Sequence, residues 1–181
     1  MGKKVCICIL LLLILTAPIV IFSLTLVTHK PKFYIEDLYI PALNNSTQSN
    51  ATRLNTFIFF DLKLQNVMPF NGLRYGDVNL TFFYGSNRSL PIAGYTVLGF
   101  YQGHKKTAHK RAVVRTRGLP WEDAFGKVSG GSTVAFGVDL ATTVKLRRCG
   151  FYTKRKAVVA AADVHVGASG EELHNKIVKL H

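Results

Sequence analysis

Beyond residue 30, apolar and polar residues alternate along the chain with a period of two. Residues 56–66 show this most clearly, because Ile58, Phe60 and Leu62 fall on one face while Asp61 and Lys63 fall on the other. Such alternation is typical of a strand that has one buried and one solvated face. The pattern therefore predicts a half-buried strand in this segment.

The alternation continues through most of the chain. It predicts further strands at 32–40, 78–85, 92–101, 111–117, 133–140, 143–149 and 157–166, with turn dipeptides at 71–72, 85–86, 130–131 and 149–150. Short strands at this spacing indicate an all-β fold. We expect an immunoglobulin- or fibronectin-III-like β-sandwich of about 7–8 strands over residues 28–166.

Two segments depart from the period of two. Residues 119–125 predict one short helical turn, and the C-terminal tail, 167–181, places Leu173, Ile177 and Leu180 at helical spacing. The tail is short and ends the chain, so a frayed tail and a tail packed on the sandwich are both open.

Residues 5–27 form a run of 23 residues without a charge. As a helix this run would be roughly 34 Å long, enough to cross a hydrocarbon core of about 30 Å. The alternative is a cleaved signal peptide, whose apolar region usually has only about 7–15 residues before a small-x-small cleavage site. We expect a transmembrane helix at 5–27 that serves as a signal anchor, after a cytoplasmic N-terminus of residues 1–4. Pro18 is compatible with such a helix.

Asn-x-Ser/Thr triplets, the acceptors of N-linked glycans, are unusually frequent. Five of the nine asparagines begin such a triplet: Asn44, Asn45, Asn50, Asn79 and Asn87. Acceptors are used only where the chain enters the secretory lumen. They therefore predict a single-pass plasma-membrane glycoprotein whose C-terminal domain is extracellular. In the strand at 78–85, Asn79 falls on the polar face, where a glycan would project away from the core.

The chain is strongly basic, with 23 Lys and Arg, 10 Asp and Glu, and a formal net charge of +13. Two groups of cations follow strand segments, and together they give a candidate patch for anionic partners at Lys105, Lys106, Lys110, Arg111, Lys145 and Arg147. Outside a cell, such a patch would meet acidic polysaccharide or anionic lipid headgroups. A solvated basic rim without a partner is the equal alternative. Nucleic acid is disfavoured by compartment and by the absence of a matching motif.

The three cysteines do not predict a disulfide framework. Cys6 and Cys8 lie at the cytoplasmic edge of the expected span, where palmitoylation and simple apolar packing are both open. Cys149 stands alone in the exported part. It is either buried and inert or available for an intermolecular disulfide.

The sequence shows no recognised catalytic or metal-binding pattern, so we expect no enzyme activity, metal or cofactor. His104 and His109 lie in a strongly positive run that would repel a metal ion, which favours solvated side chains over ligands. Asp163 and His165 share a strand face without a nucleophile. The adjacent acids at 122–123 are typical of a solvated corner. A binding or structural module fits these residues best.

One stretch is more specific. The sequence "GFYQGHKKTA" (99–108) resembles a segment of the plant harpin-induced-like, non-race-specific-disease-resistance-like family, whose members carry a late embryogenesis abundant group 2 domain. "NVMPFN" (66–71) is similar to a loosened form of that family's Asn-Pro-Asn turn. Tyr75 and the segments 82–85, 134–155 and 161–166 also fit the family's pattern. The resemblance covers residues 5–166.

The resemblance implies an exported β-sandwich anchored at the plasma membrane, in plant defence and stress signalling. The mechanism would be adhesion between membrane and cell wall, or binding of a membrane-protein partner. Two alternatives are a module that handles lipid or another apolar ligand, which needs a cavity, and a scaffold for immune receptor complexes. Some members of the family end in an apolar tail consistent with a glycolipid anchor, whereas this sequence ends in "HNKIVKLH". It also lacks a contiguous Arg-Gly-Asp or Asn-Gly-Asp tripeptide at 74–77.

Overall fold

A computed structural model describes residues 2–26, 29–45, 56–148, 150–173 and 178–180, and within the first helix it describes the side chains at 2, 7, 9, 10, 12–20 and 23. The elements are α1 (Gly2–Leu26), β1 (Lys32–Tyr39), η1 (Pro41–Leu43), β2 (Phe57–Gln65), β3 (Gly72–Tyr75), β4 (Val78–Tyr84), β5 (Leu90–Val97), β6 (Tyr101–Gln102), β7 (Thr107–Arg115), α3 (Trp121–Ser129), β8 (Val134–Arg148), β9 (Phe151–Tyr152), β10 (Lys156–Val166) and β11 (Val178–Leu180). The predicted all-β class is confirmed.

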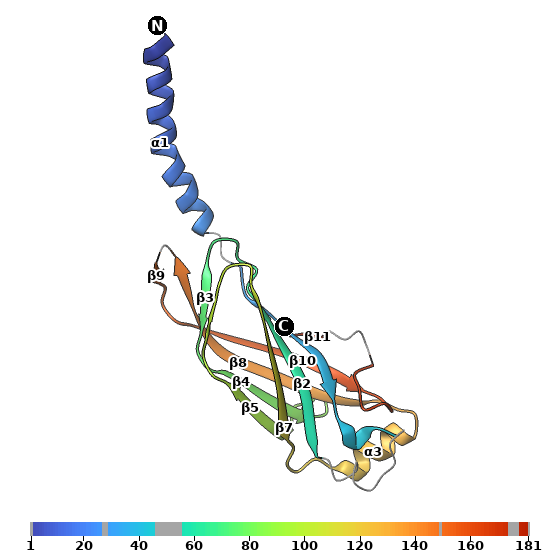
Figure 1. The fold of residues 1–181 in the computed structure, drawn as a ribbon. Coiled ribbons are helices and arrows are strands. Elements are labelled where there is room, and N and C mark those ends of the chain that lie inside the picture. The colour runs from blue at the N-terminus through green and yellow to red at the C-terminus, as the bar shows by residue number, and fades with distance from the viewer. Residues whose placement is uncertain (1, 27–28, 46–55, 149, 174–177, 181) are drawn as a thin grey trace.

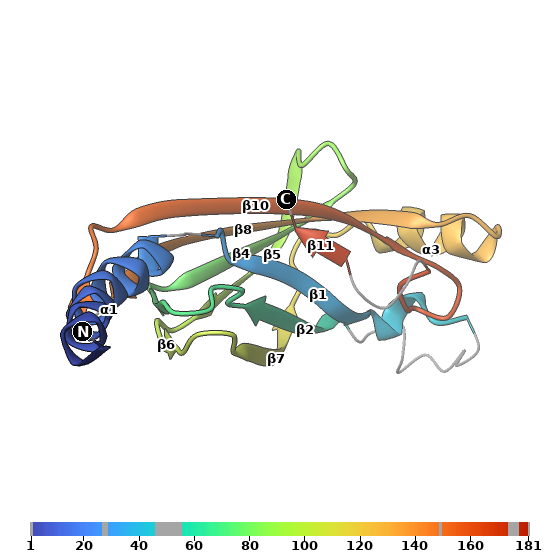
Figure 2. The ribbon, with the colours of Figure 1, turned by 90° about the horizontal axis from the view of Figure 1, so that it is seen from above.

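The strands form two antiparallel sheets that lie in two layers (Figure 1, Figure 2). The four-stranded sheet has the order β11-β1-β2-β7. In the seven-stranded sheet, β8 is central: β4 and β3 follow each other along one of its edges, while β10 and β9 follow each other along the other. Then β5 extends the sheet from β4, and β6 extends it from β3.

Residues 134–148, which the sequence divides into two predicted strands, are one strand. The alternation does not break at the junction, because Leu140, Thr142 and Val144 all point into the core. The long strand β10 pairs with β8 across the same junction, from Val144↔Lys156 to Val134↔Val166. A continuous neighbour therefore keeps β8 continuous.

The helical spacing of the tail is misleading, because its described end is strand β11. Val178–Leu180 pairs with β1, with Leu180 opposite Phe33, and the Leu180 side chain is buried. Pairing satisfies backbone groups at the edge of β1. The described end of the tail is thus packed on the domain. Ile177 lies outside the described residues.

The core fills the space between the sheets. Phe60 of the four-stranded sheet and Phe82 of the seven-stranded sheet meet with ring centroids 5.1 Å apart. At the end of the domain away from α1, η1 and α3 close this core (Figure 1). The buried positions of α3 are Ala124 and Val128. Where the sequence predicted one helical turn at 119–125, the structure has this helix of nine residues. Its apolar face has the spacing that packing on a core requires.

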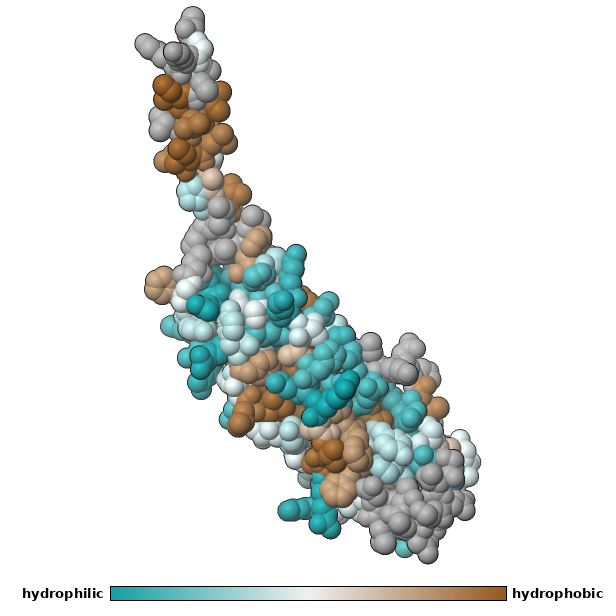
Figure 3. Space-filling view, viewed as in Figure 1, coloured by the Kyte–Doolittle hydropathy of each residue, from teal (hydrophilic) through white to brown (hydrophobic). Residues whose placement is uncertain are grey.

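Helix α1 lies outside the two-layer domain and carries apolar side chains on its surface (Figure 1, Figure 3). All nine residues from 12 to 20 are exposed, which is more than two turns. Among the residues that the structure describes, no helix is found that is long and apolar enough to cross a membrane. The predicted transmembrane helix at 5–27 is therefore not confirmed, although α1 occupies nearly the same residues.

Candidate functional site

The motif "FYQG" (100–103) lies at the end of the domain next to α1, where it includes the short strand β6 and precedes strand β7. The Gln102 side chain is buried and forms two hydrogen bonds with backbone groups. Its Nε2 atom donates to the carbonyl of Leu64 in β2 and to the carbonyl of Lys106, each at 2.9 Å. Gln102 thereby joins the two sheets and closes the turn at 103–106.

Asn66, in the "NVMPFN" segment, holds the same turn from the other side. Its Nδ2 atom donates to the carbonyls of Asn71 and Gly103, both at 2.9 Å, and its Oδ1 atom accepts from the backbone N–H of Met68 at 3.0 Å. The Asn66 side chain is 1% exposed. The two segments that carry the family resemblance are therefore one structural unit, a clamp that fixes two neighbouring loops.

The aromatic residues of this unit are stacked. The rings of Phe100 and Tyr75 lie 4.9 Å apart at 25°, and the Lys110 ammonium lies 4.7 Å from the centroid of the Phe100 ring. Burial raises the pKa of the Tyr75 hydroxyl well above its usual value, so this group stays neutral. The motif is thus a packed framework, and its residues shape the surface without forming a reactive centre.

Tyr101 extends the framework to the outer face of the seven-stranded sheet. Its ring covers Gly72, where a Cβ atom would collide with the tyrosine hydroxyl. The Arg147 guanidinium lies 5.6 Å from the centroid of the Tyr101 ring, within the range of a cation–π contact. Gly72 therefore allows Tyr101 to lie flat and to stack with a cation from β8.

The structure does not bring the six predicted cations into one patch. Lys105 and Lys106 are exposed in the turn at 103–106. Lys110 and Arg111 are adjacent on β7 and point to opposite faces, since Lys110 pairs with the buried Leu62. Lys145 and Arg147 lie on the outer face of the other sheet.

A cationic residue that the sequence analysis missed, Arg74, joins this last pair. Its strand β3 is inserted next to β8 with Arg74 directly opposite Lys145. Arg74, Lys145 and Arg155 line a hollow of about 220 Å³, together with backbone at Gly76 and Gly99. We call this the cationic hollow. Because strand β3 was not predicted, the sequence analysis could not place Arg74 opposite Lys145.

Carboxylates and cations alternate on the outer face of the four-stranded sheet. Glu36 Oε1 lies 2.6 Å from Lys63 Nζ, and Asp61 Oδ2 lies 2.9 Å from Arg111 Nε. His109 Nδ1 lies 3.0 Å from Glu36 Oε2, so the histidine predicted to be merely solvated contacts a carboxylate. Glu36, Asp61 and His109 together offer atoms within 4.8 Å of one another, a spacing that could hold a metal ion. Lys63 and Arg111 already balance the two carboxylates, so we interpret the group as an ion-pair network.

Among the described residues, Glu172 is the acid whose ionisation the fold disfavours most clearly. Burial, with a smaller contribution from the negative charge of Asp37, raises its pKa from 4.5 to about 7. Its segment is bound to the domain through a bridge between Glu172 and Val166. The pKa of this one carboxyl in the C-terminal segment therefore lies near neutral pH.

A larger pocket of about 470 Å³ lies at the α1 end of the domain. Its walls are apolar side chains of β3, β8 and β10, namely Leu73, Val144, Leu146 and Val158, and its rim includes His29, Lys30 and Lys156. The sequence analysis named such a cavity as the requirement for an apolar-ligand function. The alternation of the strands could not show it, because a cavity depends on which strands lie side by side and on the segment that lies over them.

The predicted glycan acceptors have different surroundings. Asn79 and Asn87 are exposed, the first on the outer face of β4 as expected and the second in the β4–β5 turn. Asn44 and Asn45 are half-buried: Asn44 Nδ2 donates to the Tyr39 hydroxyl at 3.4 Å, and Asn45 Oδ1 accepts from Ser129 Oγ at 3.4 Å. Asn50 and Cys149 lie outside the described residues, as do the side chains of Cys6 and Cys8.

Two acidic positions that we considered for catalysis are ion-paired. Asp163 lies 2.8 Å from Arg88 Nη2, and Arg88 also contacts Asp139 at 2.6 Å, which ties the β4–β5 turn to β8 and β10. Asp123 accepts hydrogen bonds from Lys127 at 2.7 Å and from the Tyr84 hydroxyl at 2.6 Å, and both lower its pKa. Both sites connect elements of the fold.

An apolar N-terminal helix, an all-β domain and the "FYQG" clamp are the features that the resemblance to the plant NDR1/harpin-induced-like family leads us to expect. No family model matches the chain. It is, however, 32% identical over 186 residues to Protein NDR1 of Arabidopsis thaliana, and the match covers 99% of this chain and 83% of that protein. The chain therefore belongs to this family, and the relationship supports a role in plant defence.

Proposed function

We propose that the protein acts in plant defence signalling at the plasma membrane, where α1 attaches it to the bilayer and the β domain binds a partner outside. Its relationship to Protein NDR1 over nearly the whole chain carries the defence part of this proposal. The role is one of binding, without catalysis. We include in the proposal that the two sheets form a sandwich of the immunoglobulin- or fibronectin-III-like type.

The surface of α1 supports the attachment. A helix that is apolar on all sides has no solvated face and is suited to a lipid environment. Its two described hydroxyls are internally satisfied, since Thr16 Oγ1 donates to the Leu12 carbonyl at 2.9 Å and Ser23 Oγ donates to the Val20 carbonyl at 2.8 Å. Internal satisfaction of this kind is required where water is absent.

Orientation and attachment can be tested together in plant microsomes. We expect the protein to stay in the membrane pellet at alkaline pH and to lose the mass of several glycans on treatment with a deglycosylating enzyme. Release into the supernatant would contradict attachment through α1. Full digestion of the β domain by protease in sealed vesicles whose cytosolic side faces outward would contradict an extracellular domain.

The cationic hollow supports binding of an acidic cell-wall polysaccharide. Arg74, Lys145 and Arg155 present positive charge around one concave site, and the carboxylates of polygalacturonate are anions of matching charge. This proposal changes the expected site, because Arg74 and Arg155 take the place of Lys105, Lys106, Lys110 and Arg111.

The test is polygalacturonate binding by the full-length protein in detergent. Lys145→Glu with Arg74→Glu should weaken binding at least tenfold, and added salt should weaken wild-type binding further, because the attraction is electrostatic. Arg115→Glu with Arg117→Glu is the matched control, since these exposed cations lie at the opposite end of the domain. Equal loss in both double variants would show that net charge alone mediates the binding.

The pocket at the α1 end supports a second candidate function, the handling of a lipid or another apolar ligand. Its apolar walls and its rim of Lys30 and Lys156 suit an acyl chain with an anionic headgroup. Native mass spectrometry of the purified protein would show a co-purifying lipid. Val144→Trp, which fills the pocket, should abolish that mass while the protein stays folded. A scaffold for immune receptor complexes remains a third interpretation, and affinity capture that recovers receptors without polysaccharide would favour it.

A further inference from the structure

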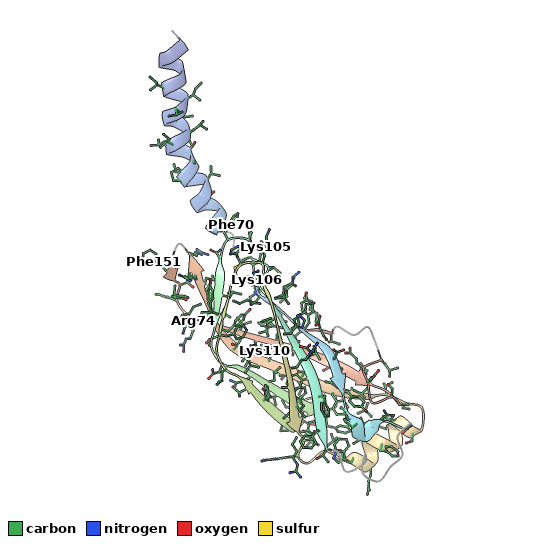
Figure 4. All side chains as sticks on the ribbon, viewed as in Figure 1. Phe70, Arg74, Lys105, Lys106, Lys110 and Phe151 are labelled. Atoms are coloured by element: carbon green, nitrogen blue, oxygen red, sulfur yellow. The ribbon has the colours of Figure 1, made fainter. Side chains whose placement is uncertain are left out.

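Two phenylalanines are exposed at the end of the β domain next to α1 (Figure 4). Phe70, in the loop before β3, is 55% exposed, and Phe151, at the start of β9, is 81% exposed. Neither was singled out by the sequence, because both lie in turn segments outside the alternating strands. Exposed aromatic rings of this size are unfavourable in water, so this end of the domain has the chemistry of an interaction surface.

Two lysines lie beside one of these rings. Lys105 and Lys106 lie beside Phe70 in Figure 4, and hydrogen bonds fix their turn against the Phe70 loop. The backbone N–H of Lys105 donates to the Met68 carbonyl at 3.1 Å, and the backbone N–H of Asn66 donates to the Lys106 carbonyl at 3.0 Å. The lysines are therefore held next to the aromatic ring by the clamp.

The backbone conformation at Lys105 indicates that the turn is held in one defined shape. Its φ angle is +51°, a left-handed conformation that side-chain-bearing residues adopt rarely. Glycine would be the ordinary residue there, yet the chain has a lysine. The turn is ordered by the bonds from Gln102 and Asn66, which offset the strain.

We propose that Phe70, Phe151, Lys105 and Lys106 form a membrane-docking end. It would rest on the bilayer that holds α1, with the two rings in the interfacial layer and the lysines on the phosphates of anionic lipids. Aromatic rings and lysines are the side chains that favour the boundary between water and lipid. The occupant is argued from continuity, because α1 enters the domain at this same end (Figure 1). The proposal rests on the attachment of α1 to the membrane.

Docking would fix the orientation of the domain. The contact would add a second point of attachment to the one that α1 provides. With the end seated on the bilayer, the cationic hollow on the outer face of the seven-stranded sheet would be held at a constant height above it. The predicted cations would then have different roles. Lys105 and Lys106 would contact lipid, and Lys145 would contact the external partner.

The test is hydrogen–deuterium exchange of the full-length protein in lipid nanodiscs, with zwitterionic lipid alone or with about 30% phosphatidylglycerol. We expect amides in 66–71, 103–106 and 150–152 to exchange about fivefold more slowly in the anionic discs. About 0.5 M NaCl should remove the difference, because it screens lysine–phosphate attraction.

Variants separate docking from folding. Lys105→Glu with Lys106→Glu, and Phe70→Ser with Phe151→Ser, should each abolish the protection at the docking end while β8 and β10 exchange as in the wild type. Arg115→Glu with Arg117→Glu, an equal change of charge at the far end, should leave the protection intact.

Three results would overturn the proposal. Protein that is retained in both kinds of disc with equal exchange at the docking end would refute docking and leave attachment standing. Protection of the same amides by polygalacturonate without anionic lipid would assign the surface to a wall polymer. Failure of the protein to remain in discs of either kind would refute attachment through α1, and docking with it.

Discussion

The side chains of Asn66 and Gln102 hold the same four-residue turn from opposite sides. Asn66 Nδ2 donates to the carbonyl of residue 103, where the turn begins, and Gln102 Nε2 donates to the carbonyl of residue 106, where it ends, each at 2.9 Å. Both amides are buried, and they belong to the two sequence segments that carry the family resemblance. In this chain, the two segments that carry the family resemblance therefore form a structural clamp that positions the surface next to α1.

The clamp predicts a clear loss of stability on truncation of Gln102. In Gln102→Ala the carbonyl of Leu64 loses the amide donor, and the carbonyl of Lys106 keeps only its bond from the Asn66 N–H. A buried group left unsatisfied costs about 1–3 kcal/mol. We expect the free energy of unfolding to fall by about 2–3 kcal/mol in chemical denaturation. Gln65→Ala, a half-buried position of β2, is the control and should change it by less than about 0.5 kcal/mol. A loss no larger than that of the control would contradict the clamp.

Gly72 and Tyr101 predict a coupled pair. In Gly72→Ala the new methyl group collides with the tyrosine ring, and the forced displacement should cost about 1–3 kcal/mol. In a Tyr101→Ala background the same change should be neutral or stabilising by up to about 1 kcal/mol, because alanine is more favourable than glycine within a strand.

A double-mutant cycle on the free energy of unfolding measures this coupling. The stacking of Arg147 on Tyr101 makes Arg147→Ala a useful third variant, which should lose stability only where Tyr101 is present. Additive effects of Gly72→Ala and Tyr101→Ala would show that the ring does not depend on glycine.

Glu172 predicts that stability falls as pH rises. Its pKa is raised to about 7 in the folded protein from 4.5 in the unfolded chain, so between these values the folded state binds more protons. The contribution of Glu172 to the free energy of unfolding is therefore greatest below pH 4.5. It falls as the pH rises and is fully lost above pH 7. Partial exposure and solvent screening reduce the effect to about 1 kcal/mol.

Glu172→Gln should abolish this part of the pH dependence. Between about pH 4 and neutral pH, the free energy of unfolding of the variant should rise by about 1 kcal/mol relative to that of the wild type. Denaturation curves at several pH values provide the measurement. Parallel pH profiles of the two proteins would show that Glu172 ionises normally.

Asn79 is the acceptor that the structure presents best. It lies exposed on the outer face of β4, its Oδ1 atom accepts a hydrogen bond from Thr96 at 2.9 Å, and the buried neighbours Val78 and Leu80 point away from it. We expect Asn79→Gln to remove the mass of one glycan in gels of plant microsomes and to leave stability within about 0.5 kcal/mol. Thr81→Ala, which destroys the same triplet and keeps the asparagine, should give the same shift. A mobility equal to that of the wild type would show that Asn79 is not used.

The sequence by itself determined the all-β class, most strand positions, the outward face of Asn79 and the family. These follow from local properties, since the period of two says which side chains of a strand are buried and a motif can be matched residue by residue. It also identified Lys105 and Lys106 as members of a cationic group, although not the turn in which they lie.

Only the tertiary structure decided which strands lie side by side. The insertion of β3 next to β8 brings Arg74 opposite Lys145, and the pairing of β11 with β1 makes a strand from a tail that has helical spacing. Lys110 and Arg111 are separated in the same way, because the partner strand β2 fixes which face of β7 is inward. Strand pairing joins residues far apart in the chain, and its stability comes from backbone hydrogen bonds and shared burial. Local alternation contains no information about these partners.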